Sequence, residues 1–127
     1  MALRSRTQWW GVVLDAPDAP ALARFYAGLL GWEVADDRPE WATIKAPGAT
    51  TYLAFQTSPD YRPPVWPNAE GEQQMMLHLD VEVAALEEAV EDAVALGATV
   101  SEHQPQATVR VLLDPAGHPF CLYLGEG

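Results

Sequence analysis

The chain of 127 residues has a single cysteine, Cys121, and a single lysine, Lys45. One cysteine excludes an internal disulfide and is typical of a reducing compartment. Seven basic residues against eighteen acidic ones give a formal net charge of -11, so the clustered basic side chains that nucleic acid requires are missing. No apolar run approaches the ~18 residues of a membrane span, and none follows the N-terminus at signal-peptide length. We therefore expect a cytoplasmic protein that binds neither nucleic acid nor membrane.

Common catalytic signatures are missing as well. The sequence has no glycine-rich phosphate loop, and no serine stands near a histidine in a pattern typical of a nucleophilic triad. Cys121 lies among Phe120, Leu122 and Tyr123, a setting in which a buried and unreactive thiol is the usual outcome. The excess of acidic residues favours the attraction of cations, including basic small molecules.

What the chain does contain is an ordered series of strand and helix patterns. Its length and its 49% hydrophobic content suffice for one domain with a substantial core. Asp18 predicts a helix N-cap and Gly31 a left-handed C-cap around an apolar stripe of helical period. Strands are predicted over residues 9–15, 32–35, 41–46 and 51–57, and again over 75–82, 98–102, 108–113 and 119–124, with a second helix over 84–96. The proline-rich residues 58–72 between the two halves are predicted to form a loop.

The predicted strand over residues 75–82 has two chemically different faces. The apolar Leu77, Leu79 and Val81 alternate with the face that carries Met76, His78, Asp80 and Glu82. Such a strand covers a core on one side and faces water or a cleft on the other.

The two halves also repeat each other. At an offset of 67 residues, Gly11 falls on His78 and Ala54 falls on Cys121, and the residues around them match in hydrophobic character. This internal duplication predicts two strand-helix-three-strand modules. We place the first module at about residues 7–57 and the second at about 73–127, joined by the loop 58–72 within one domain of residues 1–127.

Several segments resemble the vicinal oxygen chelate superfamily, which includes glyoxalase I, extradiol dioxygenases, fosfomycin resistance proteins and bleomycin resistance proteins. The resemblance is carried by Asp18-Ala19-Pro20-Ala21-Leu22-Ala23-Arg24-Phe25-Tyr26, Leu29-Leu30-Gly31-Trp32-Glu33-Val34, His78-Leu79-Asp80-Val81-Glu82-Val83, Leu96-Gly97-Ala98 and Asp114-Pro115-Ala116-Gly117-His118-Pro119-Phe120. More narrowly, the chain is similar to the small glyoxalase-like domain proteins. The resemblance implies an α+β fold of two paired βαβββ modules, a curled mixed sheet around a cleft, and a homodimer.

In members of that superfamily that use a metal, the ligands come from the first and last strands of each module. Carried onto this sequence, the four positions are Gly11, Ala54, His78 and Cys121, of which Gly11 and Ala54 have no donor atom. A further donor would have to come from Asp80 or Glu82, but residues two apart on a strand lie roughly ~6.5 Å apart. We therefore expect no cofactor, and expect His78 to line a cleft rather than to bind a metal.

If His78 faces the cleft, the alternation of side chains along each strand assigns the other strand residues either to the cleft or to the core. The side chains expected in the cleft as ligand-binding residues are Trp9, Tyr52, Gln56, Trp66, Met76, His78, Asp80, Cys121 and Tyr123. Those expected in the core are Trp10, Val12, Leu14, Leu53, Phe55, Leu77, Leu79, Phe120 and Leu122, and in the second helix Leu86, Ala89, Val90, Ala93 and Val94. A mostly apolar and aromatic cleft with a few polar groups is typical of a small-molecule site.

Three readings of the function remain open from the sequence. The first is a metal-free protein of the bleomycin-resistance type that sequesters a cationic or aromatic molecule, with Trp9, Trp41 and Trp66 as candidates for stacking. The second is a lyase or isomerase resembling glyoxalase I, either metal-dependent or using His78 as a general base with Asp80 or Tyr123 assisting. The third is a partner-binding or structural domain whose cleft has no ligand. His103, before Gln104-Pro105, is expected in an exposed loop.

Overall fold

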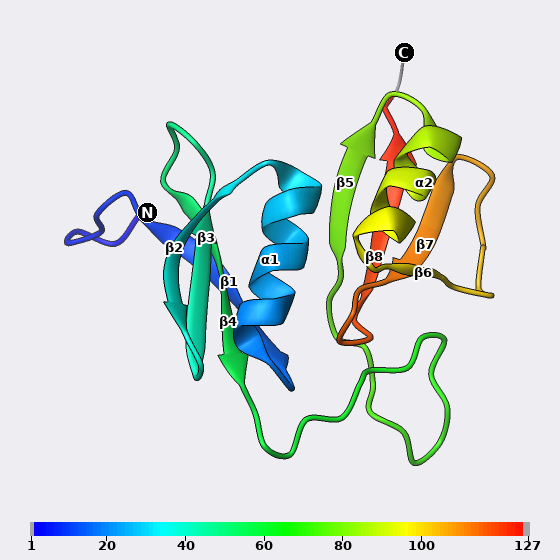
Figure 1. The fold of residues 1–127 in the computed structure, drawn as a ribbon, viewed down its shortest axis with the longest axis horizontal. Coiled ribbons are helices and arrows are strands. Elements are labelled where there is room, and N and C mark those ends of the chain that lie inside the picture. Colours follow the sequence, from blue (N-terminus) through cyan, green and yellow to red (C-terminus); the bar gives the residue numbers. More distant parts are fainter. Residues whose placement is uncertain (1, 126–127) are drawn as a thin grey trace. The chain divides into compact units, whose positions relative to one another are not determined.

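The computed structural model describes residues 2–125 and divides the chain into two compact units, Met1–Pro59 and Asp60–Gly127. We call them unit 1 and unit 2. Each contains one strand, one helix and three further strands, and each forms its own four-stranded mixed sheet (Figure 1). The predicted order of elements is therefore confirmed in both halves of the chain.

Unit 1 comprises β1 (Trp10–Ala16), α1 (Ala19–Leu30), β2 (Glu33–Arg38), β3 (Trp41–Lys45) and β4 (Thr51–Thr57). The strand order is β1-β4-β3-β2; β1 and β4 are parallel, and the other pairs are antiparallel. The helix α1 lies along one face of this sheet (Figure 1). Its position follows from the right-handed crossover that a parallel strand pair requires.

The ends of α1 lie where the sequence predicts them. The Asp18 carboxylate accepts a hydrogen bond from the Ala21 amide at 3.3 Å, and Gly31 adopts the left-handed conformation with φ of 70°. The buried face of the helix meets the sheet at Tyr26, whose ring stacks on Phe55 of β4 at a centroid distance of 5.8 Å. Burial of these rings stabilises unit 1, because each removes a large apolar area from water.

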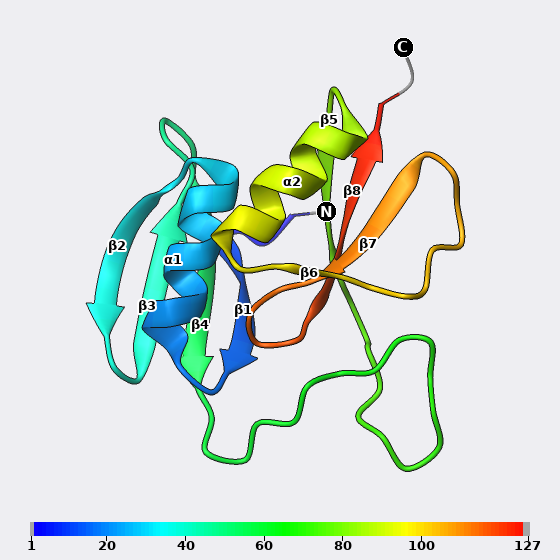
Figure 2. The same cartoon turned by 45° about the vertical axis from the view of Figure 1, so that its right-hand side comes forward.

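Unit 2 comprises β5 (Leu79–Val83), α2 (Leu86–Leu96), β6 (Thr99–Val100), β7 (Val109–Leu113) and β8 (Pro119–Leu124). The strand order is β5-β8-β7-β6, again with one parallel pair, β5 and β8. The helix α2 is adjacent to the strands of this sheet (Figure 2). The N-cap residue of α2 is Ala85, which makes no side-chain hydrogen bond to the helix, unlike Asp18 before α1.

The predicted duplication is visible in the register of the two parallel pairs. Val13 of β1 pairs with Ala54 of β4, and Asp80 of β5 pairs with Cys121 of β8. The offset between these pairs is 67 residues on both strands, as the sequence indicates. The two sheets therefore place corresponding residues at corresponding points.

The strand predicted over residues 75–82 is shorter than expected. Strand β5 begins at Leu79, where it pairs with Phe120, and the next position on β8 is Pro119. Proline has no amide hydrogen, so the ladder does not continue. Residues 75–78 belong instead to the irregular segment that begins after β4, and Leu77, predicted in the core, is 57% exposed.

Other predictions of burial also need correction. Trp10 is 52% exposed, because it opens the edge strand β1, which has a neighbouring strand on one side only. In α2, Ala93 is buried but Val94 is 46% exposed, so the buried stripe is narrower than its hydrophobic pattern suggests. The strand predicted over 98–102 is reduced to Thr99–Val100. No helix within residues 2–125 is long and apolar enough to cross a membrane.

Candidate functional site

Three side chains with metal-binding or acid-base chemistry lie together on one face of the unit 2 sheet. Asp80 on β5 and Cys121 on β8 are direct partners in the parallel ladder, so both side chains project from the same face. His78 precedes β5 by one residue, and its Nε2 lies 3.2 Å from Oδ1 of Asp80. One ligand atom from each of the three residues lies within 4.8 Å of the other two.

This arrangement contradicts the expectation drawn from strand spacing. The backbone positions of residues two apart on a strand are separated by about 6.5 Å, but His78 lies outside the ladder and its imidazole turns toward Asp80. The side chains therefore meet although their backbone positions are separated. The carboxylate of Asp80 therefore lies close enough to His78 and Cys121 to act as a third donor.

The thiol of Cys121 is held in its protonated form at neutral pH. Burial, the charge of Asp80 and a hydrogen bond to the Asp80 carboxylate together raise the pKa of Cys121 to about 11, and burial is the largest of these causes. A thiol is a poor nucleophile compared with a thiolate. The environment of Cys121 therefore favours a hydrogen-bond donor rather than a nucleophile.

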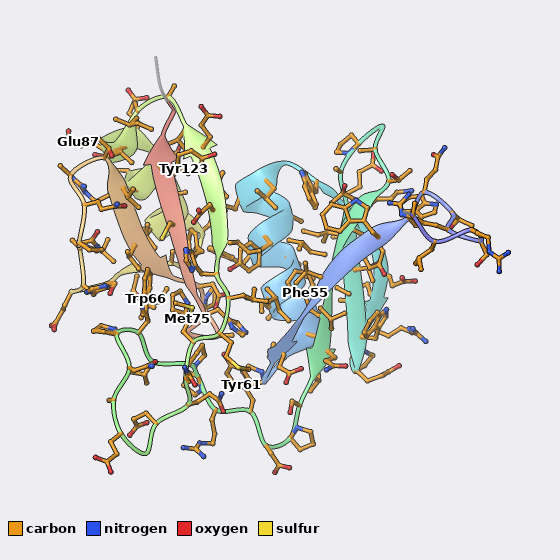
Figure 3. All side chains as sticks on the ribbon, turned by 180° about the vertical axis from the view of Figure 1, so that it is seen from behind. Phe55, Tyr61, Trp66, Met75, Glu87 and Tyr123 are labelled. Carbon is orange, nitrogen blue, oxygen red and sulfur yellow. The ribbon has the colours of Figure 1, made fainter. Side chains whose placement is uncertain are left out.

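Trp66 covers the imidazole of His78. The two rings are stacked, with centroids 5.0 Å apart and an interplanar angle of 22°, and Trp66 also meets His103 edge-on at 5.1 Å. Trp66 belongs to the irregular segment after β4, which is held locally by a bridge between Val65 and Gln74. Figure 3 shows Trp66 on this segment and Tyr123 on β8. His103, predicted in an exposed loop, is half-buried because of this contact.

These residues form part of the wall of a pocket of about 730 Å³ within unit 2. That volume is in the range of small-molecule sites. The lining residues are Trp66, His78, Asp80, Pro105, Gln106, Thr108, Val109, Val111, Cys121, Tyr123 and Leu124. The pocket therefore combines aromatic and aliphatic surface with one carboxylate and one imidazole.

The nine predicted ligand-binding residues fall into three groups. Trp66, His78, Asp80, Cys121 and Tyr123 line the pocket of unit 2.

Trp9 and Tyr52 line a separate pocket of about 300 Å³ in unit 1, with Lys45 beside them. Gln56 and Met76 line neither pocket: the Gln56 amide donates a hydrogen bond to Asp15 at 2.6 Å, and Met76 is 81% exposed.

The pocket residues that the sequence reasoning missed come mainly from residues 105–111. Val109 and Val111 of β7 pair with Tyr123 and Cys121 of β8. Because the side chains of paired residues project from the same face, the phase already assigned to Tyr123 and Cys121 identifies these valines once the pairing of β7 with β8 is assumed. Pro105 and Gln106 lie in a loop, and no periodic pattern in the sequence indicates them.

Within residues 2–59, unit 1 has no corresponding cluster. The positions equivalent to His78, Asp80 and Cys121 are Gly11, Val13 and Ala54, none of which carries a donor atom. A Cβ on Gly11 would meet the ring and the carbonyl oxygen of Tyr52. The ring of Tyr52 therefore occupies the space that the side chain of His78 uses in unit 2.

The donors present do not fit the four-position metal site that the superfamily resemblance implies, because Gly11 and Ala54 offer none. Imidazole, carboxylate and thiol are all ligands of zinc. A metal in this chain would therefore be held by His78, Asp80 and Cys121 within unit 2, and it would supply a Lewis acid next to the pocket.

The model of the glyoxalase-like domain family matches residues 11–123, and the chain belongs to that family. No curated protein sequence matches the chain.

Among solved structures, the chain is similar to a glyoxalase/bleomycin resistance protein/dioxygenase family enzyme from Burkholderia phytofirmans PsJN, with 18% identity and a TM-score of 0.62 over 88% of this chain and 94% of that one. It is similar to a glyoxalase-related enzyme from Fulvimarina pelagi, with 22% identity and a TM-score of 0.63 over 94% and 89% of the two chains. Fosfomycin resistance protein FosX from Mesorhizobium loti gives 11% identity and a TM-score of 0.62 over 98% and 95%. These similarities show the fold and confirm the predicted glyoxalase/bleomycin resistance class.

Proposed function

We propose that the protein binds a small aromatic or cationic organic molecule in the pocket of unit 2, without the four-position metal site of the superfamily and with no reaction assigned. The observation that carries this proposal is a pocket of about 730 Å³ whose wall contains Trp66 stacked on His78. Sequestration of the ligand is the simplest activity for such a site. The bleomycin resistance and fosfomycin resistance names of the structural relatives agree with a role in handling small molecules.

The lining favours a planar ligand that carries positive charge. Trp66 and Tyr123 supply aromatic surface, on which planar and cationic groups stack. The side chain of Asp80 is 57% exposed and brings a carboxylate to the same pocket. The formal net charge of -11 raises the local concentration of cations around the whole protein.

We further propose that the protein acts in the cytoplasm and as a homodimer. The single buried cysteine agrees with a reducing compartment. The dimer is a proposal from the superfamily resemblance, and measurement of the molar mass in solution tests it.

Titration of purified, chelator-treated protein with the planar cation proflavine and with a basic glycopeptide of the bleomycin type tests ligand binding. We expect quenching of tryptophan fluorescence and a calorimetric signal with at least one of these probes. Trp66→Leu should weaken binding of that probe about fivefold or more, since an aromatic contact with a cation contributes roughly 1 kcal/mol or more. Trp10→Leu is the matched control, because Trp10 is exposed in unit 1 and lines neither pocket. Absence of any signal with both probes at millimolar concentration would refute the proposal.

A second candidate, a lyase or isomerase with His78 as the general base, is favoured by one contact. The carboxylate of Asp80 lies 3.2 Å from Nε2 of His78 and can hold the imidazole in one orientation. Any turnover found by screening small carbonyl compounds should then fall at least about 100-fold in His78→Ala and remain in His118→Gln. Equal turnover in both variants would exclude His78 as the base.

A further inference from the structure

We propose that the pocket of unit 1 binds a small aromatic monocarboxylate, whose carboxylate group pairs with the ammonium group of Lys45. The pocket has a volume of about 300 Å³ and shares no lining residue with the pocket of unit 2, so this inference does not depend on the ligand proposed above. Its lining residues are Trp9, Ala35, Asp36, Thr43, Lys45 and Tyr52.

The pocket of unit 1 lies toward the β2 edge of its sheet. Two of its residues come from β2 and two from β3, whereas Gly11, Val13 and Ala54, the equivalents of the donor residues of unit 2, do not line it. The ring of Tyr52 fills the space beside Gly11. The pocket therefore differs in place and in chemistry from the donor cluster of unit 2.

A bulge in β2 shapes this pocket. Val34 pairs with Ile44 and Asp36 pairs with Thr43, so Ala35 is an extra residue in the ladder. Adjacent residues of a regular strand point to opposite faces, yet Ala35 and Asp36 both line the pocket. Bulges are common next to active sites because they redirect side chains in this way.

Lys45 supplies the positive charge of the pocket. It is the only lysine of the chain, it is half-buried on β3, and it forms no ion pair within residues 2–125, although Glu33 is its neighbour on β2. The carboxylate of Asp36 instead accepts a hydrogen bond from the hydroxyl of Thr43 at 2.8 Å. The ammonium group of Lys45 is therefore available to an anion, and a hydrogen bond between charged groups is stronger than a neutral one.

Two aromatic side chains determine the shape of the ligand. Trp9 is 52% exposed, and Tyr52 is the direct partner of Lys45 in the antiparallel pair of β3 and β4, so these two side chains project from the same face. The hydroxyl of Tyr52 makes no hydrogen bond to another residue in the described part of the chain, and it can donate one to a carboxylate. Aromatic surface beside an ammonium group suits a planar ring that carries a carboxylate.

Acidic residues around Lys45 restrict the charge of the ligand. Asp36 lines the pocket and Glu33 is adjacent on β2, so a second negative charge on the ligand would be repelled. The formal net charge of -11 adds to this repulsion. We therefore expect benzoate to bind more tightly than phthalate or phenyl phosphate.

Binding of benzoate to the full chain tests the proposal. NMR of the tryptophan indole groups should show a saturable shift of the Trp9 signal, which is identified by its loss in Trp9→Leu, with a dissociation constant on the order of 1 mM. Lys45→Met keeps an apolar side chain of similar length and should weaken binding at least about fivefold, because it removes the charged hydrogen bond. Lys45→Arg should retain binding. Tyr52→Phe should weaken binding about threefold.

Arg38→Gln is the matched control. It removes one positive charge from unit 1 at an exposed residue that does not line the pocket, so the affinity for benzoate should stay unchanged. Circular dichroism verifies the fold of each variant. The neutral isostere benzamide tests the role of charge in the unchanged protein, and it should bind at least about fivefold more weakly than benzoate.

Equal affinity of benzamide and benzoate would overturn the proposal, and so would equal affinity of benzoate for the parent protein and Lys45→Met. Absence of a Trp9 shift at benzoate concentrations well above the expected dissociation constant would overturn it as well. Failure here is separable from failure of the ligand binding proposed for unit 2, because benzoate and proflavine carry opposite charges and are titrated separately.

Discussion

Unit 1 and unit 2 have the same order of elements and the same parallel register, but their equivalent positions differ in chemistry. Gly11, Val13 and Ala54 stand where unit 2 has His78, Asp80 and Cys121. The backbone of a βαβββ unit therefore provides positions without determining what they do. Function depends on the side chains placed on those positions.

The pockets of the two units differ for the same reason. In unit 1, the ring of Tyr52 packs against the backbone of Gly11, and the pocket beside it has a volume of about 300 Å³. In unit 2, the position of Tyr52 is taken by Pro119, and His78 extends into a pocket of about 730 Å³. In unit 1, the ring of Tyr52 thus fills the space beside Gly11 that the side chain of His78 uses in unit 2.

The largest expected effect concerns the two cores. Phe55 in unit 1 and Phe120 in unit 2 are both fully buried. Replacing either by Ala should lower the free energy of unfolding by about 3–5 kcal/mol, because each change removes a buried ring and leaves a cavity. Urea denaturation followed by circular dichroism measures this loss. The control is Val100→Ala at an exposed position, with a change of about 0.5 kcal/mol or less. Unequal losses for Phe55→Ala and Phe120→Ala would show that the two cores are not equivalent in stability.

The second largest expected effect is a difference in stability between Ala substitutions at Gly11 and at His78, which occupy equivalent positions in the two units. A Cβ on Gly11 would lie 2.5 Å from Cδ2 and from the carbonyl oxygen of Tyr52, so Gly11→Ala should cost about 1–3 kcal/mol by forcing a shift of the backbone. His78→Ala removes a partly exposed side chain and should cost about 1 kcal/mol or less. Thermal unfolding of the two variants compares them. A tolerated Gly11→Ala would mean that Tyr52 can move away and that the site in unit 1 could be opened.

The smallest effect concerns the helix caps. Asp18 caps α1, whereas Ala85 occupies the same place before α2 with a similar extended backbone and no side-chain cap. Asp18→Ala should destabilise the protein by about 1 kcal/mol, and Ala85→Ser should stabilise it by about 0.5–1 kcal/mol. Chemical denaturation measures both changes. If Ala85→Ser has no effect, the first turn of α2 obtains its hydrogen bonds from water.

Much of the fold could be predicted because local signals and tertiary structure agree. The helix α1 has Asp18 as its N-cap and Gly31 as its C-cap, as expected, and β4 and β8 begin and end at the predicted residues. The start of β5 could not be predicted from its own alternation. Pro119 on the neighbouring strand ends the ladder there, and this depends on a pairing between residues distant in the sequence.

The candidate site could likewise be predicted only in part from the sequence. The sequence identifies His78, Asp80 and Cys121 as residues of one face, and the duplication shows that Gly11 and Ala54 cannot supply donors. It does not show that the imidazole of His78 turns to meet Asp80, nor that Trp66 stacks on His78.

By itself, the sequence determined the order of strands and helices, the duplication, and the lack of a donor atom at Gly11 and Ala54, because each depends on residue identity and short-range periodicity. Only the tertiary structure decided that three donors converge in unit 2. Convergence depends on strand register, on the end of a ladder and on the orientation of side chains, and these arise from contacts between residues far apart in the chain.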